Sequence, residues 1–423
     1  MKFFQCLLFF PLFLIFASCG AKSKPVVIWT DCAEFASYVE EFNNGESALG
    51  DGTKAIVVYK EKLAESLFSE KTAIRPDLVI GTFLKNPGIE RQLSSLSSLF
   101  AGERNENKIH RSDFYETLLE SGSDKLIPVS FNLPMVIFSS KNNAFVSKDY
   151  MLSPNEIRDD AGLFNTKNKN GVYTKMGFAP SWSRDFLYLV AKMNRVDFAM
   201  DGEKLVWNDI ALKMTVDYVV DWTLTRNTAS SNEDDFSFKY LYTPNFKQVS
   251  FDRCLFAYSD SDDFFRHSEE QIADVDFRWI CSSDEEPKIF VDDEIAMLGL
   301  HKKSANKGNA KKFIVWFFSK DTQKSLLERS ERMNLGVRSF GICGGFSSIR
   351  SVNDELFPMY YKTLLGNLPE PELLSAPRPV PSRWVSLKER VVIPYLAEKS
   401  KTETSFDTKT MEERLDIWYK QFN

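Results

Sequence analysis

Three short apolar segments, separated by two segments of helical periodicity, make residues 26–81 the part of the sequence that most constrains the fold. The apolar segments cover 26–29, 55–59 and 77–80, and the helical ones cover 35–42 and 63–68. Strands that are apolar on both faces are typical of a parallel sheet covered by helices on each side. The sequence therefore predicts an α/β fold.

The first of these helices is expected to begin with a capping box. Asp31 follows the first strand, and Glu34 stands three residues later, just before an apolar stripe. In this motif the two side chains bind free backbone N–H groups of the first helical turn. Asp31 is therefore either a helix cap or, because it lies at the end of a strand, a ligand-binding residue.

Further along the chain, two neighbouring extended segments at 126–131 and 134–139 look like a crossing between two lobes. A helix is expected to begin at Ser153, because Pro154 and Glu156 complete a capping-box pattern. The other predicted strands are 249–258, 277–281 and 295–300. The other predicted helices are 186–193, 210–222, 310–318, 321–331 and 411–422.

The N-terminus has the pattern of a secretion signal. Lys2 precedes an apolar run that Pro11 interrupts and that is shorter than the ~20 residues of a membrane-spanning helix. Small residues then lead to Cys19, whose thiol can accept a lipid. This pattern predicts a lipoprotein signal peptide at 1–18 and a lipid-anchored tether at 19–25. The alternative is an ordinary secretory signal, and both interpretations predict export.

The charge of the chain argues against nucleic acid as a partner. The formal net charge is −6, and removing residues 1–18 removes Lys2 and no acid, which leaves −7. A nucleic-acid-binding surface would be basic, and an acidic protein also disfavours anionic ligands.

Four cysteines remain beyond Cys19, and their pairing stays open, because buried free thiols explain them equally well. These are Cys32, Cys254, Cys281 and Cys343.

The motifs of common enzymes and metal sites are absent from the sequence. The three histidines, His110, His267 and His301, are far apart, and no H-E-x-x-H pattern occurs. The segment 345–349 begins like a nucleophile elbow, but Ile349 stands where that motif requires glycine. We therefore expect no catalytic residue, no cofactor and no metal site.

Seven segments resemble one family when they are taken in order. Six of them are 26–30, 38–43, 75–79, 127–130, 136–141 and 153–157. The seventh, 310–327, carries the spacing of Phe313, Trp316, Phe317, Ser319, Gln323 and Leu327. Together they resemble the bacterial extracellular solute-binding proteins of family 1, the maltose-binding-protein-like receptors of ABC sugar importers. The resemblance covers most of 25–365, whereas the loop at 43–53 and the proline-rich segment after 368 depart from it.

The resemblance implies a two-lobe, type II periplasmic-binding-protein fold. Each lobe would be a mostly parallel sheet flanked by helices, with a hinged cleft between the lobes. The implied N-terminal lobe is 26–130 plus 300–345, and the implied C-terminal lobe is 131–299 plus 346–423. Such a protein is a monomeric, lipid-anchored periplasmic lipoprotein, is not an enzyme, and delivers a saccharide to an ABC permease. Closure about the hinge would bury the sugar.

Candidate ligand-binding residues lie where predicted strands end or in the loops beside them. Aromatic rings can cover the apolar faces of a sugar, and polar side chains can bind its hydroxyl groups. Trp182 lies in a polar loop and is the better candidate, whereas the tryptophans on apolar strands also fit the core. The candidates are Trp29, Asp31, Phe83, Ser181, Trp182, Trp279, Phe346 and Ser347.

Three other functions remain open on the sequence alone. The same scaffold could bind a peptide or a polyamine, and the acidic charge would suit a cationic ligand. An exported glycoside hydrolase is a second alternative, because its paired carboxylates meet in space and leave no sequence motif. A surface adhesin is the third, and it would not need a hinge.

Overall fold

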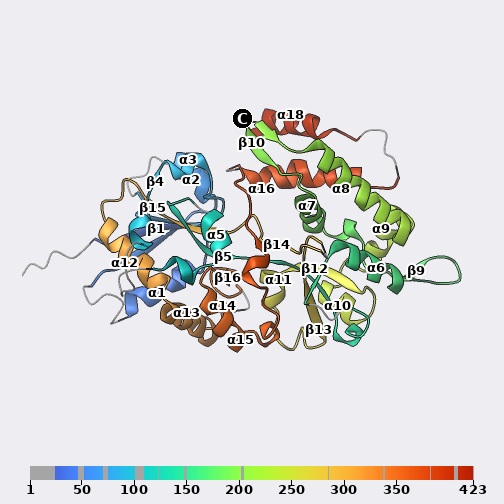
Figure 1. Cartoon of the computed structure of the whole chain (residues 1–423), viewed down its shortest axis with the longest axis horizontal. Helices are drawn as coiled ribbons and strands as arrows, with labels where there is room; N and C mark the ends of the chain where they lie inside the picture. Colours follow the sequence, from blue (N-terminus) through green and yellow to red (C-terminus); the bar gives the residue numbers. More distant parts are fainter. Residues whose placement is uncertain are drawn as a thin grey trace, which may run out of the picture.

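The computed structural model has two α/β lobes side by side, with the C-terminal helices over the second lobe (Figure 1). The signal peptide, Cys19 and the tether up to residue 23 lie outside the described residues, so the structure does not test the predicted anchor. The structure describes residues 24–45, 52–69, 75–100, 109–121, 123–146, 150–201, 204–283, 285–336, 339–381, 383–403 and 408–422.

The first lobe is built on the sheet that the sequence predicts. Strand β1 (Val26–Thr30) pairs in parallel with β2 (Ala55–Tyr59) and with β3 (Leu78–Gly81). Strand β15 (Ala296–His301) is antiparallel to β3, to β4 (Leu93–Ser94) and to β5 (Leu126–Phe131), and β16 (Phe346–Ser347) is antiparallel to β5. The strand order is β16-β5-β15-β3-β1-β2.

Helices from two separate parts of the chain surround the first sheet (Figure 1). Those of the N-terminal part are α1 (Phe35–Asn44), α2 (Leu63–Ser69), α3 (Pro87–Glu90), α4 (Ser97–Phe100) and α5 (Glu116–Ser121). Those of the later part are α12 (Lys307–Phe317), α13 (Lys320–Arg332), α14 (Arg350–Glu355) and α15 (Phe357–Tyr360). The chain therefore returns to the first lobe after passing through the second.

The second lobe contains a four-stranded sheet in the order β12-β6-β13-β7. Its strands are β6 (Pro134–Ser139), β7 (Met151–Leu152), β12 (Phe256–Asp260) and β13 (Val275–Ile280). Only β13 and β7 pair in parallel, because β6 leaves the hinge while β12 and β13 run toward it. The pairing in this lobe is therefore mixed, where the sequence predicts a mostly parallel sheet.

Helices and short hairpins complete the second lobe and the C-terminal region. The helices are α6 (Pro154–Phe164), α7 (Arg184–Met193), α8 (Asp209–Trp222), α9 (Ser230–Lys239), α10 (Asn245–Ser250), α11 (Ser261–Phe265), α16 (Trp384–Leu387), α17 (Ile393–Lys399) and α18 (Met411–Phe422). The short strands are β8 (Thr166–Lys167), β9 (Tyr173–Lys175), β10 (Ala199–Asp201), β11 (Lys204–Val206), β14 (Ile289–Phe290) and β17 (Leu374–Ser375).

The strands show where the chain crosses between the sheets. β5 ends at Phe131 in the first sheet, and β6 begins at Pro134 in the second. The return crossing lies between β14 and β15, so the first sheet already includes Ala296. β16 also joins the first sheet. The sequence-based lobe boundaries at 299/300 and 345/346 stay predictions; the first falls within β15 and the second directly before β16.

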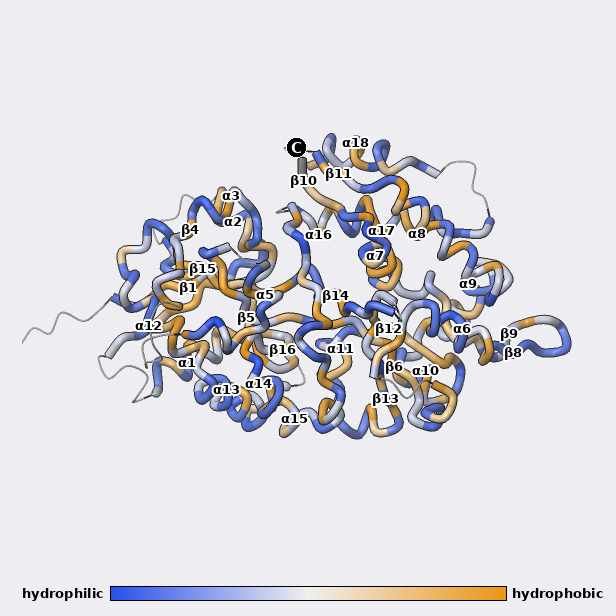
Figure 2. The backbone as a smooth tube through the Cα atoms, viewed as in Figure 1, coloured by the Kyte–Doolittle hydropathy of each residue, from blue (hydrophilic) through white to orange (hydrophobic). Residues whose placement is uncertain are grey.

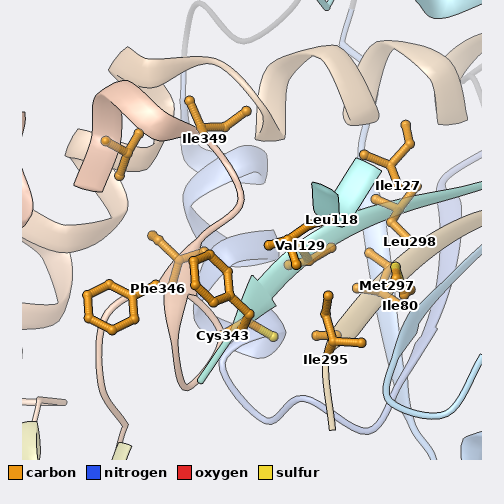
Figure 3. Packing of buried hydrophobic residues seen from close by; sticks show 14 of the residues in the cluster. Ile80, Leu118, Ile127, Val129, Ile295, Met297, Leu298, Cys343, Phe346 and Ile349 are labelled. Carbon is orange, nitrogen blue, oxygen red and sulfur yellow. The ribbon is translucent and has the colours of Figure 1, made fainter. Parts of the chain in front are cut away.

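One apolar cluster runs through both lobes past the hinge. It joins residues of the first sheet, such as Ile80 and Leu298, with Phe277 and Trp279 of the second sheet. Figure 3 shows its part around Phe346, and apolar segments line the inside of both lobes in Figure 2. A second cluster joins the C-terminal helices to α7 and α8; its buried members include Trp384, Trp418, Leu187 and Leu212.

The two predicted capping boxes have different outcomes. The Ser153 hydroxyl accepts a hydrogen bond from the Glu156 backbone, and the Glu156 carboxylate accepts one from the Ser153 N–H, so this box is confirmed. The box at Asp31 is wrong, since α1 begins at Phe35 without a side-chain cap and Asp31 binds Thr82 instead.

The predicted strand 249–258 is partly wrong, because helix α10 continues to Ser250.

Two further properties concern the described residues only. Cys32, Cys254, Cys281 and Cys343 are free thiols, and the side chain of Cys32 contacts that of Cys343. Among the helices that the structure describes, none combines the length and the apolar character that crossing a bilayer requires.

Candidate functional site

A cavity of about 450 Å³ opens on the second lobe, within the size range of small-molecule sites. Aromatic, acidic and amide side chains share its wall, together with one arginine. The aromatic residues are Phe178, Trp182, Tyr240 and Tyr258, and the charged ones are Arg184, Asp185, Asp260 and Asp263. Asn245, Gln248 and several hydroxyl side chains add uncharged donors and acceptors. Such a wall can cover an apolar ligand face and bind polar groups at its edge.

The cavity lies at the hinge end of the second sheet. Asp260, the last residue of β12, pairs with Pro134, the first residue of β6 after the crossing. The next residue, Ser261, donates a 2.5 Å hydrogen bond to the side chain of Asn132, which lies in the crossing itself. The floor of the cavity is therefore tied to the segment that joins the lobes.

Trp182 is held at the cavity wall by α9. Its indole N–H donates a 3.1 Å hydrogen bond to the carbonyl of Glu233, and its ring stacks on Phe236 with centroids 5.4 Å apart. Phe178 meets the same ring edge-on. Trp182 remains partly exposed, so a ligand can contact the part of the ring that faces the cavity. Of the predicted residues, it is the one that lines this cavity.

Ser181 supports this loop. Its hydroxyl donates a hydrogen bond to the carboxylate of Glu233, which is fully buried and also accepts a 2.7 Å hydrogen bond from Asn227. Burial raises the pKa of Glu233, although these hydrogen bonds oppose the shift. Because its hydroxyl is already bound, Ser181 positions Trp182 and does not itself line the cavity.

Carboxylates dominate the electrostatics of the site. Burial raises the pKa of Asp260 to about 6, and the neighbouring carboxylates of Asp263, Asp292 and Asp262 add to the shift. The pKa of the Tyr258 hydroxyl is well above its usual value, first through burial and then through Asp292, Asp260, Asp185 and Asp263. Four carboxylates therefore act on one hydroxyl group at the cavity wall.

The predicted residues of the first lobe do not line this cavity. The Asp31 carboxylate accepts hydrogen bonds from the Thr82 backbone at 3.1 Å and from its hydroxyl at 3.0 Å, which joins the ends of β1 and β3. Burial raises the pKa of Asp31. Trp29 is 4% exposed, with the Lys60 ammonium 4.7 Å from its ring centre. Both residues lie at the carboxyl end of the first sheet, where a cleft ligand would reach that lobe.

Phe83 connects the lobes. It follows β3 in the first lobe and packs against the apolar cluster that joins α7 and α8 to the C-terminal helices. Its φ of 56° is in the left-handed region, which is uncommon for a non-glycine residue. Two residues later, the Lys85 ammonium donates a 3.1 Å hydrogen bond to the carbonyl of Pro377. Phe83 is therefore an interlobe contact.

Three predicted ligand residues belong to the core. Trp279 is fully buried, and its indole N–H donates a hydrogen bond to the carbonyl of Asn367 at 2.6 Å. Phe346 is 1% exposed and packs among the residues of Figure 3. Ser347 is fully buried, and its hydroxyl donates to Gln323. The structure therefore places these three residues in the core, since the pattern of an apolar strand does not distinguish a core side chain from a ligand-binding one.

The sequence reasoning missed most of the cavity wall. Asp260 ends a strand and could have been found by the strand-end rule, but the strand predicted from the sequence stops at residue 258. Asp185 lies in the first turn of α7, beside the predicted Trp182 loop. Tyr240 and Asn245 flank the connection between α9 and α10, and no local pattern marks that connection as part of a site.

Comparisons with known proteins agree with this geometry at the level of the fold. No family model matches the chain, and no curated protein matches it. Among solved structures, a family 1 extracellular solute-binding protein from Alicyclobacillus acidocaldarius superposes with a TM-score of 0.59 at 11% identity, covering 94% of this chain and 98% of that one.

Two sugar-binding proteins are similarly close. The cyclic α-maltosyl-1,6-maltose binding protein of Arthrobacter globiformis gives a TM-score of 0.58 at 14% identity, covering 93% of this chain and 96% of that chain. The maltose-binding protein MalE of Listeria monocytogenes, solved with maltose, gives a TM-score of 0.58 at 12% identity. The superposition covers 94% of this chain and 97% of that chain. The chain therefore has the two-lobe fold of the solute-binding proteins of ABC transporters.

Proposed function

We propose that the protein is the solute-binding subunit of an ABC importer and that it captures a saccharide between its lobes. The observation that carries the proposal is the aromatic-walled cavity beside the hinge of this fold. Trp182 supplies an apolar platform, and the side chains of Asn245 and Gln248 supply hydroxyl partners. Structural neighbours that bind maltose or related oligosaccharides support the same ligand class.

Binding would be coupled to closure of the lobes. A ligand that contacts both the second-lobe cavity and the strand ends near Asp31 favours the closed arrangement by binding it more tightly. The ligand would leave unchanged, and delivery would require a permease. We assign no catalytic role to any residue, since the neighbours with this fold are binding proteins.

A thermal-shift screen tests the function. The protein without residues 1–18 would be heated with mono- and oligosaccharides, peptides, polyamines and metal ions. A saccharide that binds the folded state must raise the unfolding midpoint. Solution scattering with the same ligand should then show a smaller radius of gyration. A peptide that raises the midpoint when no sugar does would overturn the ligand class, and release of a cleaved sugar would show an enzyme.

The lipid anchor is a separate part of the proposal. We infer that Cys19 carries acyl chains on an exported, monomeric protein. Growth of the source cells with labelled palmitate should label the wild-type protein and leave a Cys19→Ser variant unlabelled. Labelling of that variant would disprove the attachment site.

A further inference from the structure

The charges around the cavity are unequal. Three carboxylates, Asp185, Asp260 and Asp263, lie on its wall, and Arg184 is the cation among its lining residues. Asp292 lies close behind, because it acts on both Asp260 and Tyr258. A carbohydrate that carries only hydroxyl groups does not require such an excess of negative charge.

Two nearby cations, Arg266 and Lys388, pair with carboxylates of the wall other than Asp260. Arg266 pairs with Asp262 and Asp263 along α11. The Lys388 ammonium lies 3.9 Å from Asp185 and the same distance from Glu294, so two acids share it. Within the described part of the chain, no cation forms an ion pair with Asp260, whose carboxylate caps α11 by accepting a 2.8 Å hydrogen bond from the Asp263 N–H. Asp260 is thus a carboxylate without a counter-ion beside an aromatic wall.

We propose that the ligand is a saccharide bearing a protonated amine, with its ring against Trp182 and its ammonium group between Asp185 and Asp260. This inference rests on the proposed function and names the ligand class of the same site. A charge-assisted hydrogen bond from an ammonium group to a carboxylate is stronger than one between neutral partners. The ammonium would supply the positive charge that the protein lacks at Asp260. Tyr258, beside Asp260, is available to bind a hydroxyl group of the same sugar.

The titration of Asp260 supports this assignment. Burial, together with the carboxylates of Asp263, Asp292 and Asp262, raises the pKa of Asp260 to about 6 in the ligand-free protein. A bound cation would lower that pKa again, so binding of the amine should release no proton from Asp260 at pH 7.5 and should release part of a proton near pH 6. The sign follows because fixing Asp260 as a carboxylate expels its proton when the free protein is partly protonated.

The test compares three trisaccharides that share one skeleton. Calorimetric titration at pH 7 would use the β-1,4 trimers of glucosamine, N-acetylglucosamine and glucose. We expect the glucosamine trimer to bind at least ~10-fold more tightly than the other two, because one such ion pair is worth about one decade in affinity. Equal or tighter binding of the neutral trimers would overturn the inference while leaving saccharide capture intact.

Other outcomes separate the inference from the function on which it rests. If no saccharide binds in the wider screen, the proposed function itself fails. If spermidine binds and the glucosamine trimer does not, the cavity is a cation site for a polyamine, and the saccharide assignment is wrong.

Matched variants locate the charge. Asp260→Asn keeps an oxygen that can cap α11, so it should fold, and its preference for the glucosamine trimer should fall to within ~3-fold. Asp185→Asn should reduce the preference in the same direction. Glu328→Gln on α13 of the first lobe changes the net charge equally and should leave the preference unchanged. An undiminished preference in both aspartate variants would overturn the assignment to this cavity.

Discussion

The ammonium group of Lys192 lies 2.7 Å from the carboxylate of Asp293, which is almost completely buried. Tyr188 and Trp384 donate further hydrogen bonds to the same carboxylate. Asp293 lies in the return crossing, Lys192 lies on α7, and Trp384 begins the C-terminal helices. Through this ion pair and these hydrogen bonds, one carboxylate connects three parts of the chain that are distant in sequence, beside the hinge.

Asp293→Asn should destabilise the protein by about 3 kcal/mol, because it leaves the Lys192 ammonium without its buried counter-charge. Thermal and urea unfolding would measure the loss. Asp217→Asn is the control, since Asp217 forms an exposed ion pair with Lys213 and should change stability by less than ~1 kcal/mol. Equal effects of the two substitutions would contradict the structural role of Asp293.

The same carboxylate predicts a dependence of stability on pH. Burial alone would raise the pKa of Asp293, but Lys192 and the hydrogen bonds lower it below the usual value. The contribution to stability is therefore complete above the pKa of the unfolded state, about 4, and is lost as the pH falls through the lower pKa of the folded state. Wild-type protein should lose more stability than Asp293→Asn between pH 5 and the acid limit of folding.

Trp182→Ala should weaken binding of the cognate saccharide by ~1–2 kcal/mol if the ring covers a sugar face. Trp182→Phe retains a ring to stack on Phe236 and should lose less. Calorimetric titration measures the affinity, and circular dichroism of the free variants checks the fold. An alanine variant that no longer folds would instead assign Trp182 to the core.

Asp260→Asn should stabilise the ligand-free protein near neutral pH. The raised pKa of Asp260, about 6, means that ionising it in the folded protein costs free energy that the unfolded chain does not pay. This cost is absent below pH ~4 and complete above pH ~6, so the variant should gain about 1 kcal/mol at pH 7.5 and nothing at pH 4. Unfolding midpoints at both pH values decide the matter; a variant that is less stable at pH 7.5 would contradict the prediction.

Phe83→Gly should loosen the contact between the lobes. Glycine removes the ring that packs on the second lobe and also relieves the left-handed backbone, which costs ~1 kcal/mol or more for other residues. We expect a larger radius of gyration in ligand-free scattering without a lower unfolding midpoint. Asn334→Gly is the matched control, because Asn334 is also left-handed, with φ of 54°, in an exposed turn after α13. An unchanged radius would show that Phe83 does not hold the lobes together.

Local sequence patterns predicted the regular elements well. The strands β5 and β6 and the helix α18 have the bounds that the sequence suggested, and the Ser153 cap forms as expected. Each is marked by a local pattern of apolar or capping residues. The prediction at 249–258 was partly wrong, because an apolar segment of that length suits a helix or a strand until its neighbours are known.

The site could be predicted only in part. Trp182, which was predicted because its loop is polar and precedes a helix, lines the candidate cavity. Trp279 has the same side chain but lies in a strand that is covered on both faces. Its burial depends on how the second sheet packs, and the local sequence does not show that packing. Tyr240 joins the wall because α10 packs on β12 and α9 packs on the turn that carries Trp182. The cap assignment of Asp31 was wrong because its hydrogen-bond partner, Thr82, directly follows another strand.

The apolar cluster that continues past the hinge has a calorimetric consequence. Phe277 and Trp279 of one sheet share an interior with Leu298 and Phe346 of the other, so melting either half would strip its neighbour of packing partners. Heating should therefore give one endotherm, with calorimetric and van't Hoff enthalpies in a ratio of about one. The hinge can then bend at the front while the shared interior behind it makes both halves a single unit of cooperative unfolding.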